Sequence, residues 1–405
     1  MHPEHVMRKG RRIVLAIVGC AGLATLGAGA PEIVGHSFRP VRRDATHERI
    51  QQLKLPAGFT LEVFARDLGD LRMLVIGDDG TVYASRPDPG EVLALGNGDG
   101  RSEGRRTVLT GLEKAHGLAL VDHRLYVAGV RKVVAADVQV GGQLGAWRTI
   151  VDNLPDGGQH DRRTLGIGPD GLLYVSVGSS CNACDETSRE YATLLRMRPD
   201  GGERTVFARG LRNTVGFAWH PVTNELWGMD HGSDWRGDNQ PPEELNQITA
   251  SGDYGWPVCF GSRQPDPFVV SRHVLDKEAH CQATQPPALT YQAHSAPIGL
   301  VFYEGRQFPR DYRNDAFVAM HGSWNRVPPT GYKVVRIRFE KGRPVRFEDF
   351  LTGFLIEDGK AHFGRPAGLA VTREGALLVS DDANGVVYRV AYRGDRASPV
   401  RAGRR

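Results

Sequence analysis

The 405-residue sequence lacks the motifs of several common protein classes. It has no Walker loop and no clear dinucleotide-binding fingerprint, which argues against a nicotinamide cofactor. Asp185 follows Cys184 where c-type haem attachment requires His, so a cytochrome c is excluded. Beyond residue 30 no apolar stretch approaches the roughly 20 residues that span a bilayer, and beyond residue 50 no helical periodicity of any length appears. We therefore expect the chain beyond residue 30 to be soluble and rich in strands.

The body of the chain also lacks an excess of positive charge, although the formal net charge is +4. Residues 1–30 carry four basic side chains against Glu4, and the basic tail at residues 393–405 carries five Arg against Asp395. The remainder is therefore net acidic. Nucleic acid is excluded as a partner, because its binding requires a basic surface on the folded body.

Residues 1–30 are typical of an export signal, because a basic stretch precedes an apolar run. Three outcomes stay open for this segment. It is cleaved after the small residues 28–30, it is lipidated at Cys20 within a lipobox-like sequence, or it remains as a membrane anchor. We therefore expect a periplasmic or secreted protein, secreted free or attached to a membrane at its N-terminus, with residues 31–50 as a linker.

Four cysteines remain beyond the export segment, an even number for an oxidising compartment. The simplest prediction is two disulfides, Cys181–Cys184 and Cys259–Cys281. A four-cysteine zinc site is the alternative.

A short phrase recurs along the chain: a turn rich in Gly, Asp or Asn, followed by a short β-rich run. An apolar run containing Gly-Leu-Ala or a close variant often precedes it, which is typical of a hairpin. Together with 50 Gly and 24 Pro, this indicates many short strands. The six copies lie at residues 77–85, 121–129, 168–178, 221–232, 313–322 and 373–382.

The spacing of these copies is close to the 40–50 residues of a four-stranded propeller blade. The pattern predicts an all-β fold, a six-bladed β-propeller with four-stranded antiparallel blades over residues 51–392. One longer spacing predicts an inserted loop region near residues 233–297. A β-sandwich or two β domains would leave the six copies unexplained.

Polar side chains precede the expected innermost strands of five blades, and they would converge at the mouth of the central channel. A basic ring that contains two His suits an anionic ligand, with His as a proton acceptor. The residues are Arg72, His116, His160, Arg212, Asn213 and Arg365.

Through these residues and the motifs around them, the sequence resembles the glucose/sorbosone dehydrogenase family, and most closely its sorbosone-dehydrogenase branch. Members are secreted six-bladed propellers that use pyrroloquinoline quinone (PQQ) and calcium. The resemblance covers most of residues 50–392. Its motifs are Gly157-Gly158-Gln159-His160, Gly210-Leu211-Arg212-Asn213, Asp230-His231-Gly232-Ser233, Glu244-Leu245-Asn246, Asp253-Tyr254-Gly255-Trp256-Pro257, His321-Gly322-Ser323-Trp324-Asn325-Arg326 and Gly364-Arg365-Pro366.

The resemblance implies catalytic roles for two residues. His160 would be the general base that removes a hydroxyl proton while hydride moves from the sugar to PQQ. Arg212 would stabilise negative charge that develops on the quinone oxygen. The backbone carbonyls of Gly232 and Ser233 would hold calcium.

Further residues would bind the cofactor. Asn213 would form a hydrogen bond with PQQ, and Arg365 would pair with one of its carboxylates. His321 stands where the glucose-oxidising branch has a Lys, and Phe363 stands where it has a further Arg. Arg326 is a candidate replacement for that charge, and Arg72 and His116 would line the same mouth.

The sequence thus predicts an exported PQQ- and calcium-dependent dehydrogenase that oxidises an aldose or a sorbosone-like substrate. Its electrons would pass to a quinone, a cytochrome or a dye. Two alternatives stay open: a propeller that binds a carbohydrate or another ligand without catalysis, and a calcium-dependent lactonase.

Overall fold

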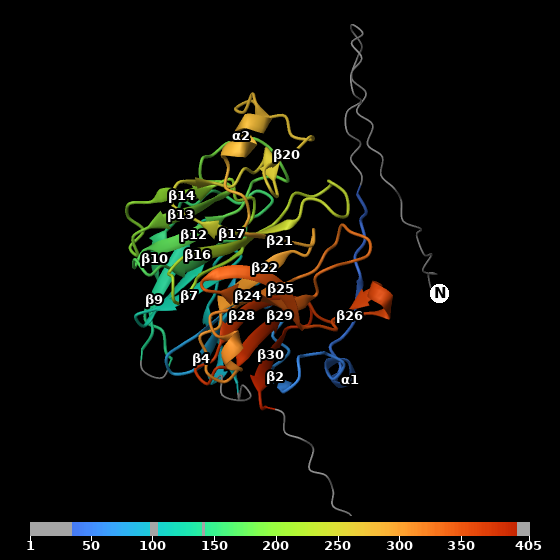
Figure 1. Cartoon of the computed structure of the whole chain (residues 1–405). Coiled ribbons are helices and arrows are strands. Elements are labelled where there is room, and N and C mark those ends of the chain that lie inside the picture. The colour runs from blue at the N-terminus through green and yellow to red at the C-terminus, as the bar shows by residue number, and fades with distance from the viewer. Residues whose placement is uncertain (1–34, 98–103, 140–141, 395–405) are drawn as a thin grey trace, which may run out of the picture.

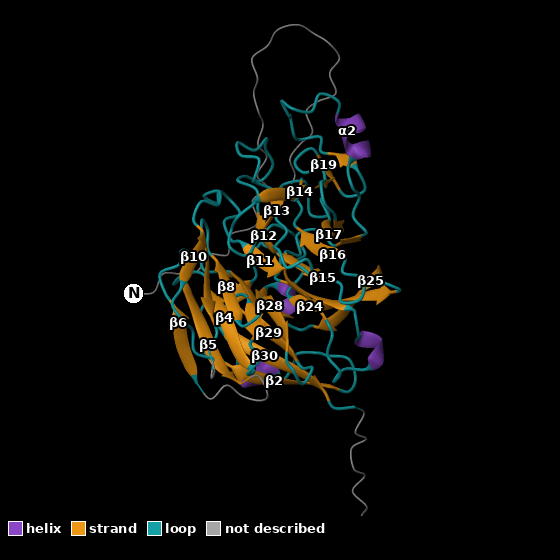
Figure 2. Cartoon of the chain, turned by 90° about the vertical axis from the view of Figure 1, so that its left-hand side faces the viewer, coloured by secondary structure: helices purple, strands orange, loops and turns teal. Residues whose placement is uncertain are grey.

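The computed structural model describes residues 35–97, 104–139 and 142–394. Strands dominate these ranges (Figures 1 and 2), which confirms the predicted all-β class. The two α-helices of the described ranges are short, α1 (His47–Ile50) and α2 (Lys277–Ala283). None of the helices found there is long and apolar enough to cross a membrane. The expected export segment and nearly all of the basic tail lie outside the described residues.

Six sheets of at least four strands make up the body of the molecule, and their neighbouring strands are antiparallel with one exception. Sheet 1 consists of β3 (Leu74–Ile76), β4 (Thr81–Arg86), β5 (Glu91–Asn97) and β6 (Arg105–Leu109). Sheet 2 consists of β7 (Gly117–Val121), β8 (Arg124–Ala128), β9 (Val133–Asp137) and β10 (Arg148–Val151). Sheet 3 consists of β11 (Thr164–Ile167), β12 (Leu173–Val177), β13 (Thr193–Met197), β14 (Thr205–Arg209) and β18 (Gly252–Asp253).

The other three sheets follow the same plan. Sheet 4 consists of β15 (Gly216–Trp219), β16 (Leu226–Asp230), β17 (Glu243–Ile248) and β21 (Leu289–Tyr291). Sheet 5 consists of β22 (Pro297–Phe302), β23 (Ala316–Met320), β24 (Lys333–Glu340) and β25 (Arg343–Leu351). Sheet 6 consists of β28 (Pro366–Val371), β29 (Leu377–Asp381), β30 (Val386–Tyr392) and the N-terminal β2 (Phe59–Ala65).

Two details differ from the sequence prediction. Sheet 3 has a fifth strand, because β18 pairs in parallel with β14. The inserted region is also shorter than residues 233–297, since β17 and β21 inside that range belong to sheet 4. The insertion proper lies between these two strands and contains β18, β19 (Cys259–Phe260), β20 (Gln264–Pro265) and α2.

The predicted disulfides Cys181–Cys184 and Cys259–Cys281 are both present. A zinc site that needs all four of these thiolates is therefore excluded.

The recurrent turn has a local cause. Asp79 Oδ1 accepts a hydrogen bond from Thr81 N at 3.0 Å, and Asp170 Oδ1 accepts one from Leu172 N at 3.1 Å. An Asp side chain that caps the backbone two residues ahead nucleates a tight turn. The first and second strands of sheets 1 and 3 are joined in this way.

The innermost strands touch one another in the order β3, β7, β11, β15, β22 and β28, and β28 touches β3 again. Glycines in the Gly-Leu-Ala phrases permit this approach. A Cβ on Gly216 would lie 2.4 Å from Ile298 O, and one on Gly368 would lie 2.2 Å from Arg72 O. These glycines are present because the backbone of the next sheet occupies the space of a side chain.

Apolar side chains fill the spaces between consecutive sheets. Trp227 of sheet 4 packs in one cluster with Phe302 of sheet 5, for example. Sheets 6 and 1 are joined in the same way, because Leu378 packs with Leu93. The core is therefore divided into layers, each buried by two neighbouring sheets.

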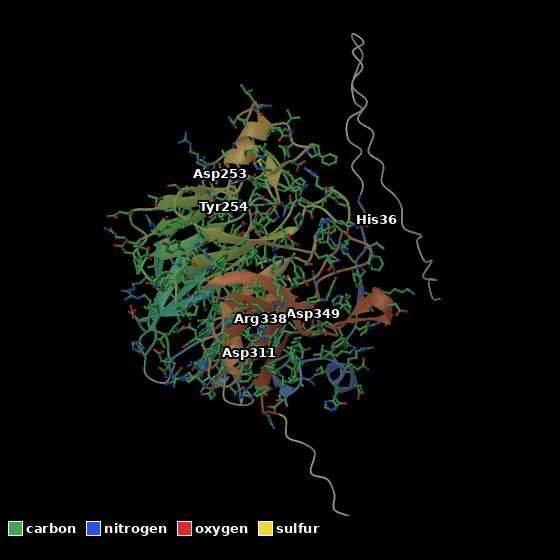
Figure 3. All side chains as sticks on the ribbon, in the orientation of Figure 1. His36, Asp253, Tyr254, Asp311, Arg338 and Asp349 are labelled. Carbon is green, nitrogen blue, oxygen red and sulfur yellow. A yellow bond between two sulfur atoms is a disulfide. The ribbon has the colours of Figure 1, made fainter. Side chains whose placement is uncertain are left out.

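Residues 35–50, expected as a linker, contact the loops of sheets 4 to 6 instead. His36 Nδ1 lies 2.8 Å from Asp238 Oδ2, and His36 is labelled in Figure 3. Phe38 N donates to Trp324 O at 2.9 Å. In Figure 1 this blue segment runs along one side of the molecule to α1. On the way, β1 (Val41–Arg42) pairs in parallel with β27 (Ala361–His362), which also pairs with β26 (Leu355–Ile356).

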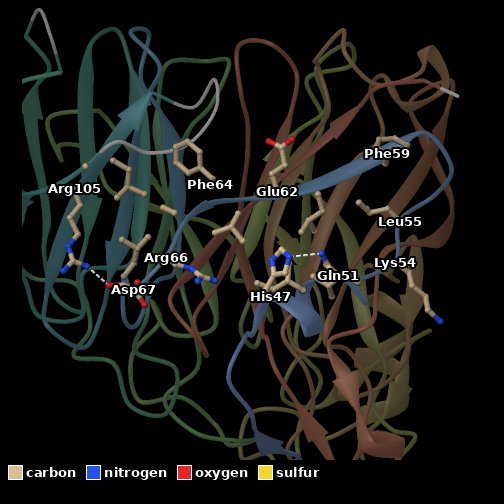
Figure 4. A pocket seen from close by; sticks show the side chains of 18 residues that line it. His47, Gln51, Lys54, Leu55, Phe59, Glu62, Phe64, Arg66, Asp67 and Arg105 are labelled. Atoms are coloured by element: carbon tan, nitrogen blue, oxygen red, sulfur yellow. Dashed lines mark hydrogen bonds between the residues drawn. The ribbon is translucent and has the colours of Figure 1, made fainter. Parts of the chain in front are cut away.

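A wide surface hollow of about 1330 Å³ runs beside α1 and β2 (Figure 4). It is lined by apolar residues such as Leu55 and Phe59, together with charged residues such as Glu62 and Arg105. None of the residues predicted to carry chemistry lines it. The candidate active site therefore lies elsewhere.

Candidate active site

The residues expected to carry chemistry lie at one edge of the sheets. His160, Arg212 and Arg365 precede the innermost strands β11, β15 and β28, while Gly232 and His321 follow the second strands β16 and β23. The first strand of an antiparallel pair begins where the second one ends. The fold therefore brings these residues to the same edge.

Three predicted residues, His160, Arg212 and Gly232, line one cavity of about 220 Å³. The same cavity is lined by Gln159, His231, Asp234, Glu243, His294, Ala296, Trp324 and Asn325. An imidazole and a guanidinium that face one small cavity can act on the same bound molecule.

The tautomer of His160 follows from its neighbours. Its Nδ1 lies 3.1 Å from Ser179 O, which can only accept, and 2.8 Å from Ser179 Oγ. Ser179 Oγ itself donates to Cys181 O at 2.7 Å. The ring proton is therefore assigned to Nδ1, and Nε2 keeps its lone pair.

Burial lowers the pKa of His160 to about 2, and the positive charge of Arg212 acts in the same direction. The imidazole is consequently neutral at every ordinary pH. The ring therefore has the protonation state and the free lone pair that a general base needs.

Arg212 is 3% exposed and is held by two residues from other loops. Its Nε and Nη2 donate to Asn182 O and Asn182 Oδ1, each at 2.9 Å, and Nη2 also lies 3.2 Å from Asp234 Oδ2. The guanidinium is thus fixed in orientation, and Asp234 balances its charge.

Asp230 fixes the backbone that carries Arg212 and Asn213. Its carboxylate accepts from Arg212 N at 2.9 Å, from Asn213 N at 2.8 Å and from Thr214 Oγ1 at 2.8 Å. Burial raises the pKa of Asp230 to about 6 despite these donors. Asn213 Nδ2 lies 3.5 Å from His231 Nδ1, which places the predicted Asn213 beside the cavity.

A second group of predicted residues surrounds Asp382, which the sequence did not single out. Arg72 Nε lies 3.0 Å from Asp382 Oδ2, and His321 Nε2 lies 2.8 Å from the same oxygen. Arg365 donates through Nη2 to Gly322 O at 3.0 Å. Burial alone would raise the pKa of Asp382, but the charge of Arg72 and the hydrogen bond from His321 hold it well below its usual range.

The two groups are joined through the backbone. His321 N donates to Ala296 O at 3.0 Å, and Ala296 lines the cavity of His160. Burial lowers the pKa of His321 to about 3, and Arg365 adds to this effect. The ring is therefore a neutral partner of Asp382 and contributes no positive charge.

Two further predicted residues, His116 and Arg326, lie outside the lining of the His160 cavity, as do Arg72, His321 and Arg365. His116 is 1% exposed, and its Nδ1 lies 3.1 Å from Arg163 O, within the core. Arg326 donates to Pro328 O at 3.0 Å and to Asp238 O. The side chains of His116 and Arg326 thus bond to backbone carbonyls. The neighbours of Arg326 in the sequence, Trp324 and Asn325, do line the cavity.

The loop after β16 carries Gly232 and Ser233 and is bordered by buried carboxylates. Gly232 N donates to Glu243 Oε2 at 3.0 Å. Gly232 and Ser233 line a second cavity of about 20 Å³ together with Asp230 and Glu244. Burial raises the pKa of Glu243 and of Glu244 to about 8. This cavity offers oxygen ligands at the size of one water or one cation.

Comparison with known proteins shows which family the chain belongs to. The profile of the family described as TrAA12-like matches residues 53–393. A protein of Borreliella burgdorferi described only as uncharacterized is 32% identical over 366 residues, 86% of this chain and 93% of that protein. A pyrroloquinoline quinone-dependent pyranose dehydrogenase of Coprinopsis cinerea is 29% identical over 234 residues, 45% of this chain and 31% of that protein.

Solved structures share the fold. The calcium structure of Trichoderma reesei Carbohydrate-Active Enzymes Family AA12 has a TM-score of 0.72 at 22% identity, over 84% of this chain and 97% of that chain. The holo form of the pyranose dehydrogenase PQQ domain from Coprinopsis cinerea has a TM-score of 0.71 at 21% identity, over the same shares of the two chains. The family resemblance predicted from the motifs is thereby confirmed, and the chain belongs to the TrAA12-like family.

Proposed function

We propose that this protein is a PQQ- and calcium-dependent sugar dehydrogenase, with the six sheets as blades of a propeller and the His160 cavity at its mouth. The relatives that are named as PQQ-dependent sugar dehydrogenases support the activity. The observation that carries the proposal is the pairing of a neutral, oriented His160 with a buried Arg212 in one cavity.

In this proposal His160 Nε2 accepts the proton of the sugar hydroxyl as the carbon is oxidised. Its Nδ1–H stays bonded to Ser179, so the ring keeps its orientation while Nε2 gains the proton. Arg212 presents fixed N–H groups to an oxygen that gains negative charge, which lowers the barrier without reorganisation. When bound, PQQ supplies the two-electron acceptor for the hydride.

The residues around Asp382 fit an anionic quinone cofactor. Arg72 Nε is buried and forms an ion pair with Asp382 without a well-aligned hydrogen bond, so the guanidinium of Arg72 would have to turn to meet a carboxylate ligand. Arg365 and Arg212 add two further guanidinium groups at this edge, and such planar forks match carboxylates. Asn213 would add a hydrogen bond to the same cofactor.

The small cavity beside Gly232 and Ser233 fits calcium. Their backbone carbonyls are the expected ligands, and the carboxylate of Glu244 lines the same cavity. Buried carboxylates with raised pKa values lose their desolvation penalty when a divalent cation arrives. Bound calcium would therefore keep the Glu244 carboxylate ionised and would hold the carbonyls of Gly232 and Ser233 in place.

Export and electron transfer complete the proposal. Two disulfides suit an oxidising compartment, which supports a periplasmic or secreted enzyme. The electrons would pass to a quinone, a cytochrome or an artificial dye, and the substrate would be an aldose or a related sugar.

The proposal is tested by reconstitution. The apoprotein is supplied with PQQ, with Ca²⁺, with both or with neither, and dye reduction is followed with a panel of aldoses and sorbosone. We expect activity only when both are present, and loss of activity when a chelator is added. Turnover with neither component, or no PQQ binding by calorimetry in the presence of Ca²⁺, would contradict the proposal.

A further inference from the structure

One loop touches both proposed catalytic residues. Residues 179–185 follow β12, and the Cys181–Cys184 disulfide closes a small ring within them. At its start, Ser179 receives the Nδ1 proton of His160. Ser179 Oγ then donates to Cys181 O, so the contact to His160 is linked to the ring itself.

The middle of the loop holds the arginine. Asn182 lies inside the disulfide ring, and its carbonyl oxygen and side-chain oxygen accept two bonds from Arg212. The same side chain bonds the backbone of Asp234, with Oδ1 accepting from Asp234 N at 2.8 Å and Nδ2 donating to Asp234 O at 3.1 Å. Asn182 thus fixes the arginine and its carboxylate partner together.

The far side of the loop rests on the insertion. Ala183 packs against the apolar cluster that contains Cys259 and Cys281. Asp185 accepts from Ser271 Oγ and from Arg272 N, each at 2.7 Å. The loop is therefore held on one side by the insertion and contacts the site with the other.

We propose that residues 179–185 form a positioning loop, in which the disulfide ring presents Ser179 to His160 and Asn182 to Arg212. This inference rests on the proposed function, since it assigns the loop to that reaction. The loop touches no reacting atom, and it acts by fixing the direction of two side chains that do. A four-residue ring restricts the backbone of Asn182, whose carbonyl must point at Arg212 Nε.

The first test needs no cofactor. Nitrogen-15 NMR of the apoprotein follows the Nε–H and Nη2–H groups of Arg212, assigned by their disappearance in Arg212→Lys. We expect slowly exchanging signals in the natural chain. Asn182→Ala should lose the Nη2–H signal, because it removes Oδ1 but keeps the carbonyl that accepts from Nε, and the double variant Cys181→Ser/Cys184→Ser should lose both signals. Asn153→Ala is the matched control, because Asn153 is an exposed Asn that accepts from another arginine, Arg204. An unchanged Nη2–H signal of Arg212 in Asn182→Ala would overturn the proposal.

The second test uses the reconstituted enzyme. We expect Asn182→Ala to lower kcat about 10- to 100-fold, the effect of a small misplacement of a catalytic group, with an unchanged KM for the sugar. In an Arg212→Ala background the same substitution should have no further effect, because its target is gone. Additive losses would indicate a general structural role and overturn the proposal.

The two tests separate the inference from the proposed function. If the natural chain oxidises no sugar with PQQ and Ca²⁺, the proposed function fails, while the NMR result still decides whether the loop fixes Arg212. If Cys181→Ser/Cys184→Ser fails to fold, Asn182→Ala, with its disulfide intact, carries both tests.

Discussion

Most of the positively charged residues expected at the mouth have a negatively charged or carbonyl partner. Asp234 lies beside Arg212, and Asp382 lies beside Arg72. Two backbone carbonyls accept hydrogen bonds from Arg326. The sequence indicated the arginines because they precede recurrent strands. It could not indicate the two carboxylates, because Asp234 lies in a loop without a repeated pattern and Asp382 follows a strand of a different sheet from the one that Arg72 precedes.

His160 is the residue on which the proposed chemistry depends. We expect His160→Ala to lower kcat by about 10²- to 10⁴-fold, the usual contribution of a general base. Because His160 stays neutral with a pKa of about 2, its ionisation should give kcat/KM no acid limb near pH 6.5. Steady-state dye reduction between pH 5 and 8 checks both statements.

The matched control for this variant is His47→Ala, which removes an exposed His remote from the cavity. We expect full activity from the control and similar melting temperatures for both variants. Full activity of His160→Ala would refute the assignment of the base.

Strands with simple patterns were predictable, and the exceptions have a physical reason. The turn and the apolar run of β12 repeat in other sheets, so the strand could be recognised. Strand β17 reads Glu-Glu-Leu-Asn-Gln-Ile and is almost entirely buried. Glu243 accepts from Gly232 N and Ala296 N, and Glu244 accepts from Gly261 N. Polar side chains satisfied by distant backbone leave no alternating pattern, so the sequence does not distinguish this strand from the insertion that follows it.

The close approach of the innermost strands can be tested with a substitution that adds one methyl group. Gly368→Ala would place a Cβ 2.2 Å from Arg72 O, so β28 and β3 would have to separate. We expect a loss of about 1–3 kcal/mol in the free energy of unfolding, as is usual for overpacking. Denaturant unfolding followed by tryptophan fluorescence measures it.

Gly145→Ala provides the comparison, because a Cβ there meets nothing closer than 3.5 Å. We expect this variant to unfold like the natural chain. Equal stability of the two alanine variants would mean that the strands can move apart without cost.

At the scale of the described part of the molecule, an early strand and the last strand meet in sheet 6. Strand β2 pairs with β30 from Phe59 opposite Tyr392 to Ala65 opposite Val387. The cluster between sheets 6 and 1 then completes the series of layers. The sequence predicted the number of recurrent hairpins, but it did not show that the N-terminal strand would complete the sheet of the C-terminal ones.

This arrangement predicts a sharp truncation boundary. A chain that begins at residue 67 lacks β2 and leaves the edge of β30 unpaired, and we expect its Tm to fall by about 10 °C or more. A chain that begins at residue 56 lacks β1 and α1 but keeps β2, and we expect a clearly smaller fall. Calorimetry compares the two, and equal Tm values would show that β2 adds nothing to the fold.

The pairing of β2 with β30 also sets an order of events at the ribosome. At about 5–20 residues per second, the roughly 320 residues between the two strands take about 15–65 s to synthesise. Throughout that time β2 has emerged and has no partner, with Phe59, Leu61 and Val63 accessible to other chains. A newly made chain therefore depends, for most of its synthesis, on whatever shields its first strand until its last one arrives.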